Sequence, residues 1–434
     1  MRISIENGKV LDPSNKIDQK QNIFIADGKI VSLKKKPDGF SADITLNAKD
    51  KIILPGLVDL CARLREPGFE KKGNFNSELH AANSSGITSV SVPPDTVPVV
   101  DTPSVVEFIH QRAREINRAN VYPLGALTQE LKGEQLAEMY LLKEAGCVGI
   151  SNALVAISNT EVLRRAFEYA NSCDLTVFMY AQDEKITNNG VVHEGAISAR
   201  LGLPAIPETA ETIAISRALL LIEQTNARAH FCHLSSARAV DLIRTAKKNG
   251  AQITADVSIC NLHLTDMDIA DYDSNCHLNP PLRSERDRVA LIKGLCDETI
   301  SAVCSDHQPH EDNAKSAPFS MTEPGASTIE HLLPLMLHLV NRNEIKLNRA
   351  LSLLTSEPAK ILGVSKGTIE NNKNADLCIY DPNKNLSIDK NNLFSSGKNT
   401  PFNGWELQGE VTHTLLNGKV VFSRKYAYDS SKDT

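Results

Sequence analysis

Residues 55–68 read PGLVDLCARLREPG, an apolar run that ends with Cys61, Arg63 and Arg65 on alternate positions. Alternate residues of a β-strand share one face. We therefore expect these three side chains to project together from the place where a buried strand ends. The stretch predicts a strand-end site built on a thiol and positive charge, with no histidine or carboxylate between them.

Downstream of this strand, β-rich runs alternate with amphipathic helical stretches, as in a parallel sheet with crossover helices. Helical segments are predicted, for example, at 103–119, 160–172, 236–250 and 284–295, several with a Ser or Thr cap. The predicted strands lie near 57–61, 87–92, 121–125, 147–150, 176–180, 228–233, 252–257 and 300–304. Eight such units over about 310 residues predict a (β/α)8 barrel with its chemistry at the strand ends. An open doubly wound sheet is the alternative, but no glycine-rich nucleotide loop follows the first strand.

The two ends of the chain share a different pattern. Residues 1–54 and about 365–425 consist of short alternating strands with NG and DG hairpin turns. We expect them to form one β-domain. The predicted segments are therefore 1–54 for its first part, 55–364 for the barrel, and 365–434 for its second part and a tail.

Composition excludes several classes of partner. The 434 residues carry a formal charge of -6 and a pI of about 6.1, so no basic surplus favours nucleic acid or an anionic membrane. No apolar run approaches the roughly 20 residues that span a bilayer, and the N-terminus lacks a signal-peptide pattern, so we expect a cytoplasmic protein. The nine cysteines are scattered without a CxxC pair, which predicts reduced thiols rather than a zinc knuckle.

Polar residues stand at most of the predicted strand ends. They include Asp95, Asn152, Tyr180, His233, Cys260, Asn261, His263, Asp306, His307 and His310, and the apolar Ala153 stands next to Asn152. The motifs NPPLR (279–283) and EPGAS (323–327) follow in loops near the last strands. Since the strand ends of a barrel meet at one face, these residues are the candidates for a site.

Four stretches together resemble a known family. PGLVDLCARLREPG, NPPLRSERDR, CSDHQPHE and EPGASTIEHLLPL, in this order and spacing, look like the dihydroorotase branch of the amidohydrolase superfamily. The likeness runs over nearly the whole chain. It implies an α/β fold, a (β/α)8 TIM barrel with a small β-sandwich domain formed from both termini. It also implies the reversible hydrolysis of a cyclic amide with one or two zinc ions.

Most of the metal ligands that this resemblance implies are missing. The family carries His-x-His after strand one, Asp or a carboxylated Lys after strand four, His after strands five and six, and Asp after strand eight. The corresponding positions are lost at Cys61, Arg63, Ala153 (or its neighbour Asn152) and Tyr180, and they survive at His233 and Asp306.

Two surviving ligands do not hold a catalytic zinc ion, which needs about three protein ligands and an open position for water. Without a metal, the pKa of water is about 15.7 rather than about 7. The difference corresponds to on the order of 12 kcal/mol if the water had to be ionised to the same extent. We therefore expect no cofactor and no competent catalytic residue, with Asp306 a vestige of the site.

Arg63 places a permanent cation where a metal ligand would point, and a cation repels a divalent ion. An unpaired buried carboxylate at Asp306 would be costly. We therefore expect the Arg63 guanidinium to lie in the vacated metal pocket and to pair with Asp306.

The positions that the resemblance assigns to the substrate are better kept. Arg65, Asn279 and His310 match residues that hold the substrate's carboxylate and ring, whereas Asp95 replaces an asparagine. An added anion would repel a bound carboxylate by about 4 kcal/mol at a distance of about 4 Å. Tight binding of dihydroorotate is therefore not expected. The alternative role for Arg65 and NPPLR is to hold the barrel loops together.

Thiols leave another alternative open, because soft ligands suit zinc. An improvised zinc site would comprise Cys61, Cys260, Cys304, His233 and Asp306. Against it, buried histidines such as His233 and His310 are more often structural, with hydrogen-bonded partners. No GxSxG elbow indicates a nucleophile.

These features predict a pseudoenzyme, a dihydroorotase-like barrel of pyrimidine synthesis without its metal centre. The resemblance to non-catalytic family members implies assembly with aspartate carbamoyltransferase, in a homo- or hetero-oligomer. One alternative is an active zinc-dependent dihydroorotase, or another cyclic amide hydrolase, with rearranged ligands. The other is a metal-free module that binds a pyrimidine intermediate through Arg65, Asn279 and His310.

Overall fold

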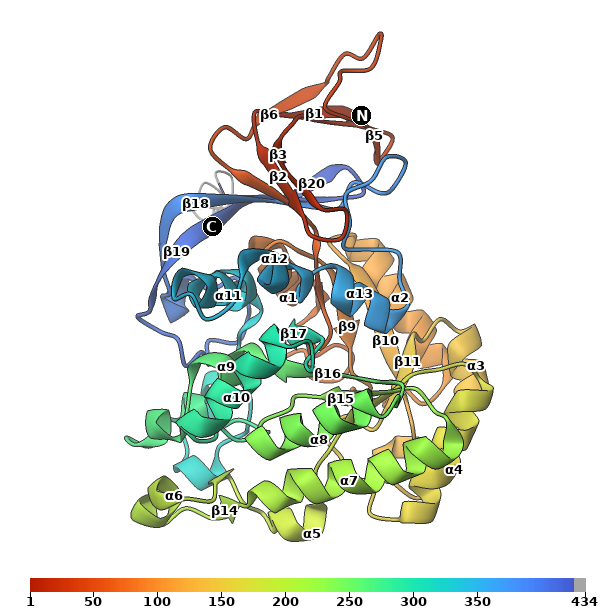
Figure 1. The fold of residues 1–434 in the computed structure, drawn as a ribbon, viewed down its shortest axis with the longest axis vertical. Coiled ribbons are helices and arrows are strands. Elements are labelled where there is room, and N and C mark those ends of the chain that lie inside the picture. Colours follow the sequence, from red (N-terminus) through yellow and green to blue (C-terminus); the bar gives the residue numbers. More distant parts are fainter. Residues whose placement is uncertain (425–434) are drawn as a thin grey trace.

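The eight predicted strands of the central region form one parallel sheet in the computed structural model, which describes residues 1–424. The sheet keeps the chain order, so that each strand pairs with the next one (Figure 1). Its strands are β8 (Leu57–Asp59), β9 (Ile87–Val92), β10 (Asn120–Ala126), β11 (Gly149–Ser151), β12 (Val177–Tyr180), β15 (Ala229–Cys232), β16 (Ile253–Ser258) and β17 (Ala302–Cys304). This sequential parallel order confirms the predicted (β/α)8 barrel and excludes the open doubly wound alternative, whose strand order reverses.

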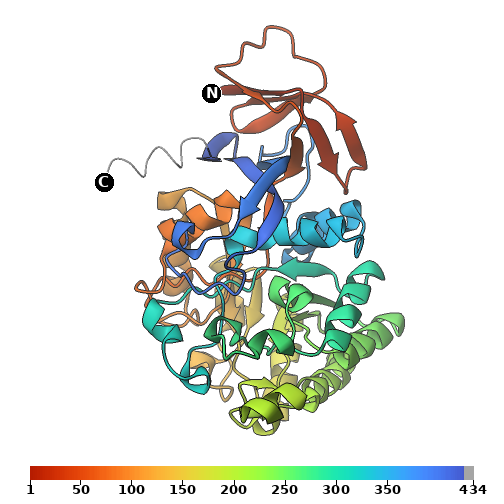
Figure 2. The same ribbon diagram turned by 90° about the vertical axis from the view of Figure 1, so that its left-hand side faces the viewer.

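Helices connect successive strands and surround the sheet (Figures 1 and 2). The connections are α1 (Phe75–Ser84), α2 (Pro103–Ile116), α3 (Met139–Glu144), α4 (Thr160–Ser172), α5 (Glu184–Thr187), α6 (Ala196–Leu201), α7 (Glu208–Thr225), α8 (Ala237–Lys248), α9 (Ile259–His263) and α10 (Glu285–Cys296), followed by α11 (Leu332–Asn341), α12 (Leu347–Ser352) and α13 (Ser356–Leu362). The connection between β12 and β15 also holds a two-stranded sheet of β13 (Val192–His193) and β14 (Ala205–Ile206). Local sequence explains many helix starts; for instance, Asn159 accepts hydrogen bonds from the backbone at the start of α4.

The first and last barrel strands meet beyond their carboxyl ends. Ala62 and His307 form a parallel bridge there. The Arg63 amide donates to the His307 carbonyl at 2.9 Å, and the His307 amide donates to the Cys61 carbonyl at 3.3 Å. This closing seam, residues 61–63 with 305–307, brings the two segments that carry the candidate site side by side.

Two further sheets lie outside the barrel, and the six-stranded one combines strands from both ends of the chain. One contains β1 (Arg2–Glu6), β4 (Ile23–Ala26), β5 (Lys29–Leu33) and β6 (Ile44–Asn47), and the other β2 (Lys9–Asp12), β3 (Ile17–Lys20), β7 (Ile52–Pro55), β18 (Leu377–Ser387), β19 (Glu406–Leu416) and β20 (Lys419–Ser423). They share a hydrophobic cluster that includes Ile5, Ile25, Ile53 and Leu377. Residues 425–434, most of the expected tail, lie outside the described part of the chain.

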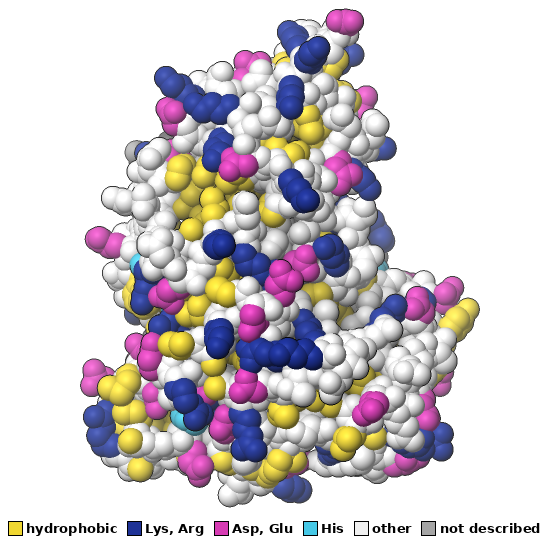
Figure 3. All heavy atoms as spheres, viewed as in Figure 1, with side chains coloured by type: hydrophobic (Ala, Val, Ile, Leu, Met, Phe, Trp, Pro, Cys, Tyr) yellow, Lys and Arg dark blue, Asp and Glu magenta, His cyan; other side chains and the backbone are white. Residues whose placement is uncertain are grey.

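Part of the barrel interior is apolar. Val58, Leu124, Phe178 and Ala302 belong to one buried cluster there. On the outside, Lys and Arg side chains are interspersed with Asp and Glu over the face in Figure 3. Within residues 1–424, none of the helices combines the length and the apolar character needed to cross a bilayer.

Candidate functional site

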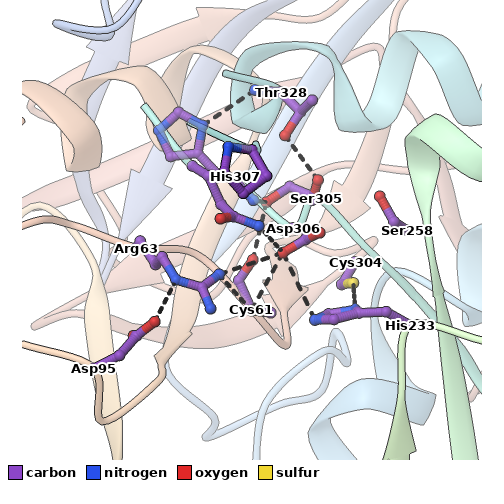
Figure 4. Close-up of polar contacts among 12 residues, drawn as sticks. Cys61, Arg63, Asp95, His233, Ser258, Cys304, Ser305, Asp306, His307 and Thr328 are labelled. Atoms are coloured by element: carbon purple, nitrogen blue, oxygen red, sulfur yellow. Dashed lines mark hydrogen bonds and ion pairs between the residues drawn. The ribbon is translucent and has the colours of Figure 1, made fainter. Parts of the chain in front are cut away.

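Arg63 lies at the centre of the candidate site. Its Nε atom donates to Asp95 Oδ2 at 2.8 Å, and its Nη1 atom lies 3.4 Å from Asp306 Oδ1. The ion pair expected between Arg63 and Asp306 is therefore present, and Figure 4 shows the guanidinium between the two carboxylates. Burial alone would lower the pKa of Arg63, but Asp95, Cys61 and Asp306 raise it. With only 5% of its side chain exposed, Arg63 is a buried cation held by two anions.

Asp95 has a partner that was not predicted. The sequence indicated only that an added anion at this position would repel a substrate carboxylate. The Asp95 carboxylate is bound to Arg63, so that most of its charge is compensated inside the protein. The position follows β9 in a loop, and loop geometry of this kind cannot be read from strand periodicity.

Cys61 lies beside the same guanidinium. Its Sγ atom is 3.9 Å from both Arg63 Nη1 and Asp306 Oδ1. Burial raises the pKa of the Cys61 thiol, although His233 and Arg63 oppose the shift. Cys61 is therefore a neutral thiol at physiological pH and neither a thiolate ligand nor an activated nucleophile.

His233 faces Asp306 with one ring nitrogen and Asp256 with the other. Its Nε2 atom lies 3.6 Å from Asp306 Oδ1, and its Nδ1 atom lies 3.1 Å from Asp256 Oδ1. Its backbone amide also donates to Asp256 at 2.7 Å. Burial opposes a charged ring, but Asp306 and the other acidic neighbours raise the pKa of His233 well above its usual value. Asp306 is thus flanked by two cationic groups.

Asp256, on β16, anchors this histidine from below and was missed by the sequence interpretation. Its second oxygen lies 2.9 Å from His230 Nε2. Burial would raise the pKa of Asp256, but the two imidazoles lower it below its usual range. The sequence did indicate a buried role for Asp256, because a carboxylate within the apolar run of a central strand requires buried partners. Gln308, which donates to Asp306 at 2.9 Å, was also missed.

Four site positions have a left-handed backbone, with φ angles of 64° at Arg65, 48° at Ala153, 57° at His233 and 46° at Asp306. This conformation costs roughly 1–2 kcal/mol for a residue other than glycine. Such residues cluster at functional sites, where the surrounding structure holds them. The backbone at Ala153 thus has the geometry of a site although its side chain has no donor atom.

Tyr180 occupies the position after the fifth strand, where the family resemblance implies a histidine ligand. Tyr180 Oη donates to Asn279 Oδ1 at 2.5 Å. Burial is the largest influence on the Tyr180 hydroxyl and raises its pKa well above the usual value. The contact uses an acceptor of Asn279, one of the residues predicted to hold a substrate.

Arg65 and His310 also contact each other. Arg65 Nε donates to the Pro309 carbonyl at 3.0 Å, and Arg65 Nη2 lies 3.2 Å from His310 Nε2. Burial and the neighbouring cations Arg65, Lys72 and Lys315 lower the pKa of His310 to about 2. Its ring is therefore neutral at physiological pH.

Arg283 of NPPLR has a structural environment. Its Nε atom donates to Ser235 Oγ at 2.7 Å, and its Nη2 atom lies 3.6 Å from Glu211. These contacts join loops after different strands, which is the loop-holding role given above as the alternative for this motif. His307 is likewise buried in a pair with Glu78.

The zinc centre of the resemblance does not fit these residues. Cys61, His233 and Asp306 each bring one donor atom within 4.8 Å of the others. However, Arg63 lies against two of these donors, and a unit charge at about 4 Å opposes each charge of an ion by about 4 kcal/mol at an effective dielectric near 20. Ala153 and Tyr180 do not restore the lost donors.

The improvised five-donor site is not assembled. Cys304 Sγ lies 3.3 Å from His233 Nδ1, on the side of the ring away from Asp306. Cys260 joins none of the donor groups found among residues 1–424. Strand-end positions alone did not show which side of each strand these thiols would face.

Two small cavities border Arg63 and Tyr180. A cavity lined by Arg63 and Asp95 measures about 10 Å³, and one lined by Ala153 and Tyr180 measures about 20 Å³. Each volume suits about one water molecule.

Comparisons with known proteins agree with the motifs. The dihydro-orotase-like family model matches residues 50–239, and the amidohydrolase family model matches residues 327–422. A dihydroorotase-like protein of Pseudomonas aeruginosa is 44% identical over 421 residues, 97% of this chain and 99% of the relative. One from Pseudomonas putida is 45% identical over 420 residues, with the same two shares. A dihydroorotase of Geobacter sp. (strain M21) is 38% identical over 425 residues, again 97% and 99% of the two chains.

Solved structures support the fold. L-hydantoinase (dihydropyrimidinase) from Arthrobacter aurescens superimposes with a TM-score of 0.86 at 23% identity, over 97% of this chain and 96% of that one. The dihydropyrimidinase of Brevibacillus agri gives 0.85 at 22% identity, over 98% and 96%. With curated relatives at 38–45% identity along almost its full length, the chain belongs to the dihydroorotase-like family of amidohydrolases.

Proposed function

We propose that this chain is a non-hydrolytic member of its family, which contributes to pyrimidine synthesis as an assembly partner of aspartate carbamoyltransferase. The observation that most directly supports a loss of hydrolytic activity is the position of Arg63. Its guanidinium contacts Asp306 and Asp95 at the strand ends, where the family would hold its metal. The contacts of Asp306 with Arg63, His233 and Gln308 all fall on Oδ1, and the fixed guanidinium charge beside that oxygen opposes the binding of a divalent ion.

Hydrolysis of a cyclic amide requires an ionised water or an equivalent nucleophile. A metal ion supplies it by lowering the pKa of water to about 7. Here the neutral Cys61 thiol and the charged His233 ring are poor substitutes, because neither accepts a proton from water at neutral pH.

The partnership is supported by the family resemblance of the motifs. A barrel that binds no metal can still present an outer surface to another protein, and the fold places its helices on that surface. The expected assembly is a hetero-oligomer with the catalytic chain of the transferase.

A second candidate function is favoured by one observation. Cys61, His233 and Asp306 converge to within 4.8 Å, and three protein ligands with an open position suffice for a catalytic zinc ion. Under this candidate, Arg63 would turn away, and the chain would be a zinc-dependent dihydroorotase. A metal-free binding module has weaker support, because Asn279 is bonded to Tyr180 and His310 to Arg65.

Three measurements on the purified chain test the proposal together. We expect less than one-tenth of a zinc ion per chain, no hydrolysis of dihydroorotate above a heat-denatured control, and co-elution with aspartate carbamoyltransferase in size-exclusion chromatography. Stoichiometric zinc with turnover would establish the second candidate instead. A transferase that is fully assembled and active alone, and that does not bind this chain, would refute the partnership. Calorimetry with dihydroorotate and carbamoyl aspartate tests the binding module.

A further inference from the structure

The Arg63 guanidinium shares its surroundings with a set of metal-type donors. Its Nη1 atom lies 3.4 Å from Asp306 Oδ1 and 3.9 Å from Cys61 Sγ. The same oxygen of Asp306 lies 3.6 Å from His233 Nε2. In Figure 4, the guanidinium, the thiol and the imidazole all converge on the Asp306 carboxylate.

These three donors have the supporting contacts that metal ligands usually have. A ligating histidine normally gives its other ring nitrogen to a carboxylate, and ligating carboxylates are themselves hydrogen-bonded. His233 Nδ1 contacts Asp256 Oδ1 at 3.1 Å, and Gln308 donates to Asp306 at 2.9 Å. The second layer of a mononuclear site is therefore in place, and it leaves His233 Nε2 directed at Asp306.

A thiol, an imidazole and a carboxylate are donors that suit zinc or cobalt. Each pair of the three donor atoms lies within 4.8 Å, as a single shared ion requires after a small contraction. Cys61 and His233 can each release a proton to a bound ion, but Arg63 cannot: its charge is permanent, and its side chain is only 5% exposed. It lies against two of the three donors.

We propose that Arg63 is an internal cation that replaces the charge of a metal ion, and that Cys61, His233 and Asp306 form a latent mononuclear metal site that opens when Arg63 is made neutral. The inference rests on the proposed function, in which the natural chain holds no catalytic metal. It goes further because it assigns a ligand set that uses Cys61 and explains how the barrel mouth is stable without an ion.

The test compares Arg63→Met with two matched variants. Arg63→Lys keeps a positive charge at the same position, and Arg65→Met removes the neighbouring arginine, which contacts Pro309 and His310 instead. Each variant is titrated with Co²⁺ alone, and the readouts are metal per chain and the near-ultraviolet charge-transfer band of a thiolate bound to cobalt. No enzyme activity is needed.

We expect one Co²⁺ per chain and the thiolate band in Arg63→Met only. Its affinity for Co²⁺ should exceed that of the natural chain by at least about 100-fold, because a fixed cation within about 4 Å of a divalent ion is removed. The band should disappear in Cys61→Ser/Arg63→Met. Absence of metal binding in Arg63→Met, or a band that persists without Cys61, would overturn the inference and leave the proposed function untouched.

Stoichiometric zinc in the natural chain, with Arg63 in place, would contradict both proposals. If Arg63→Met does not fold by itself, one of two changes must restore its folding. These are the addition of zinc, or the further substitutions Asp95→Asn and Asp306→Asn, since both remove the need for an internal cation. Failure of both rescues would overturn it.

Discussion

The two sides of the barrel mouth differ in how their side chains compare with the family pattern. On the metal side, four positions have changed, and Arg63 now joins Asp95 and Asp306. On the substrate side, Arg65, Asn279 and His310 keep the expected residue types, yet each of the three contacts another part of the chain. A matching residue type therefore does not show that a side chain is available to a ligand. Its partners decide that.

The same contrast appears in the two imidazoles. Acidic neighbours, Asp306 first among them, outweigh burial and raise the pKa of His233, while burial and nearby cations lower the pKa of His310 to about 2. At neutral pH, one side holds a charged ring and the other a neutral ring.

Substitution of Arg63 by Met should destabilise the fold by about 3–5 kcal/mol, because it leaves the Asp95 and Asp306 carboxylates without the cation that they share. The matched change Arg65→Met removes a charged donor to the Pro309 carbonyl, and we expect a loss of only about 1.5–3 kcal/mol. Urea denaturation of both variants measures the difference. Equal losses would show that the two sides do not differ in this way.

The two histidines should give opposite pH dependences of stability. His310 has a lowered folded pKa, so its contribution is present above the unfolded value of about 6.5 and is lost as pH falls toward 2. His310→Gln should therefore lessen the acid loss by up to about 1.4 kcal/mol per pH unit. His233 has a raised folded pKa, so its contribution is complete below about 6.5 and is lost as pH rises through the folded value.

For His233, the difference in unfolding free energy between the natural chain and His233→Gln should become smaller in alkaline solution. Denaturant unfolding between pH 5 and 9, with each variant compared to the natural chain at the same pH, measures both effects. A constant gap across the range would contradict the assigned charge state.

Loss of the phenol should release the substrate-side asparagine. Tyr180→Phe removes the donor to Asn279 and should cost about 1 kcal/mol, a typical net value for one hydrogen bond. Tyr140→Phe is the matched control, since Tyr140 is 55% exposed and surface changes stay within about 0.5 kcal/mol. The midpoint of urea unfolding distinguishes the two. Identical midpoints would mean that the contact contributes nothing to stability.

The smallest expected effect is that of a chelator. With Arg63 in place, treatment of the natural chain with EDTA should leave the melting temperature unchanged within about 1 °C, because no bound ion contributes binding free energy to the folded state. Differential scanning calorimetry before and after treatment measures this. A clear fall would indicate a resident metal.

The barrel could be predicted from the sequence because strand and helix periodicities differ strongly. All eight predicted strands overlap observed ones, although boundaries shifted, as at β11, which begins at Gly149 rather than near 147. The Arg63–Asp306 pair could also be foreseen, since a buried carboxylate needs a compensating charge. The contact of Arg63 with Asp95, the anchoring of His233 by Asp256 and the separate position of Cys304 depend on loop paths and on side-chain direction. These loop paths and side-chain directions could not be predicted from a single sequence.

The closing seam has a consequence for the way the chain is made. Residues 61–63 find their partners only at 305–307, and β7 pairs with β18, which lies still further along the chain. A ribosome must therefore synthesise most of the protein before the first barrel strand acquires its last neighbour. Until then, nascent chains expose an open edge that invites association with other unfinished copies. The need for chaperones should thus persist until late in translation.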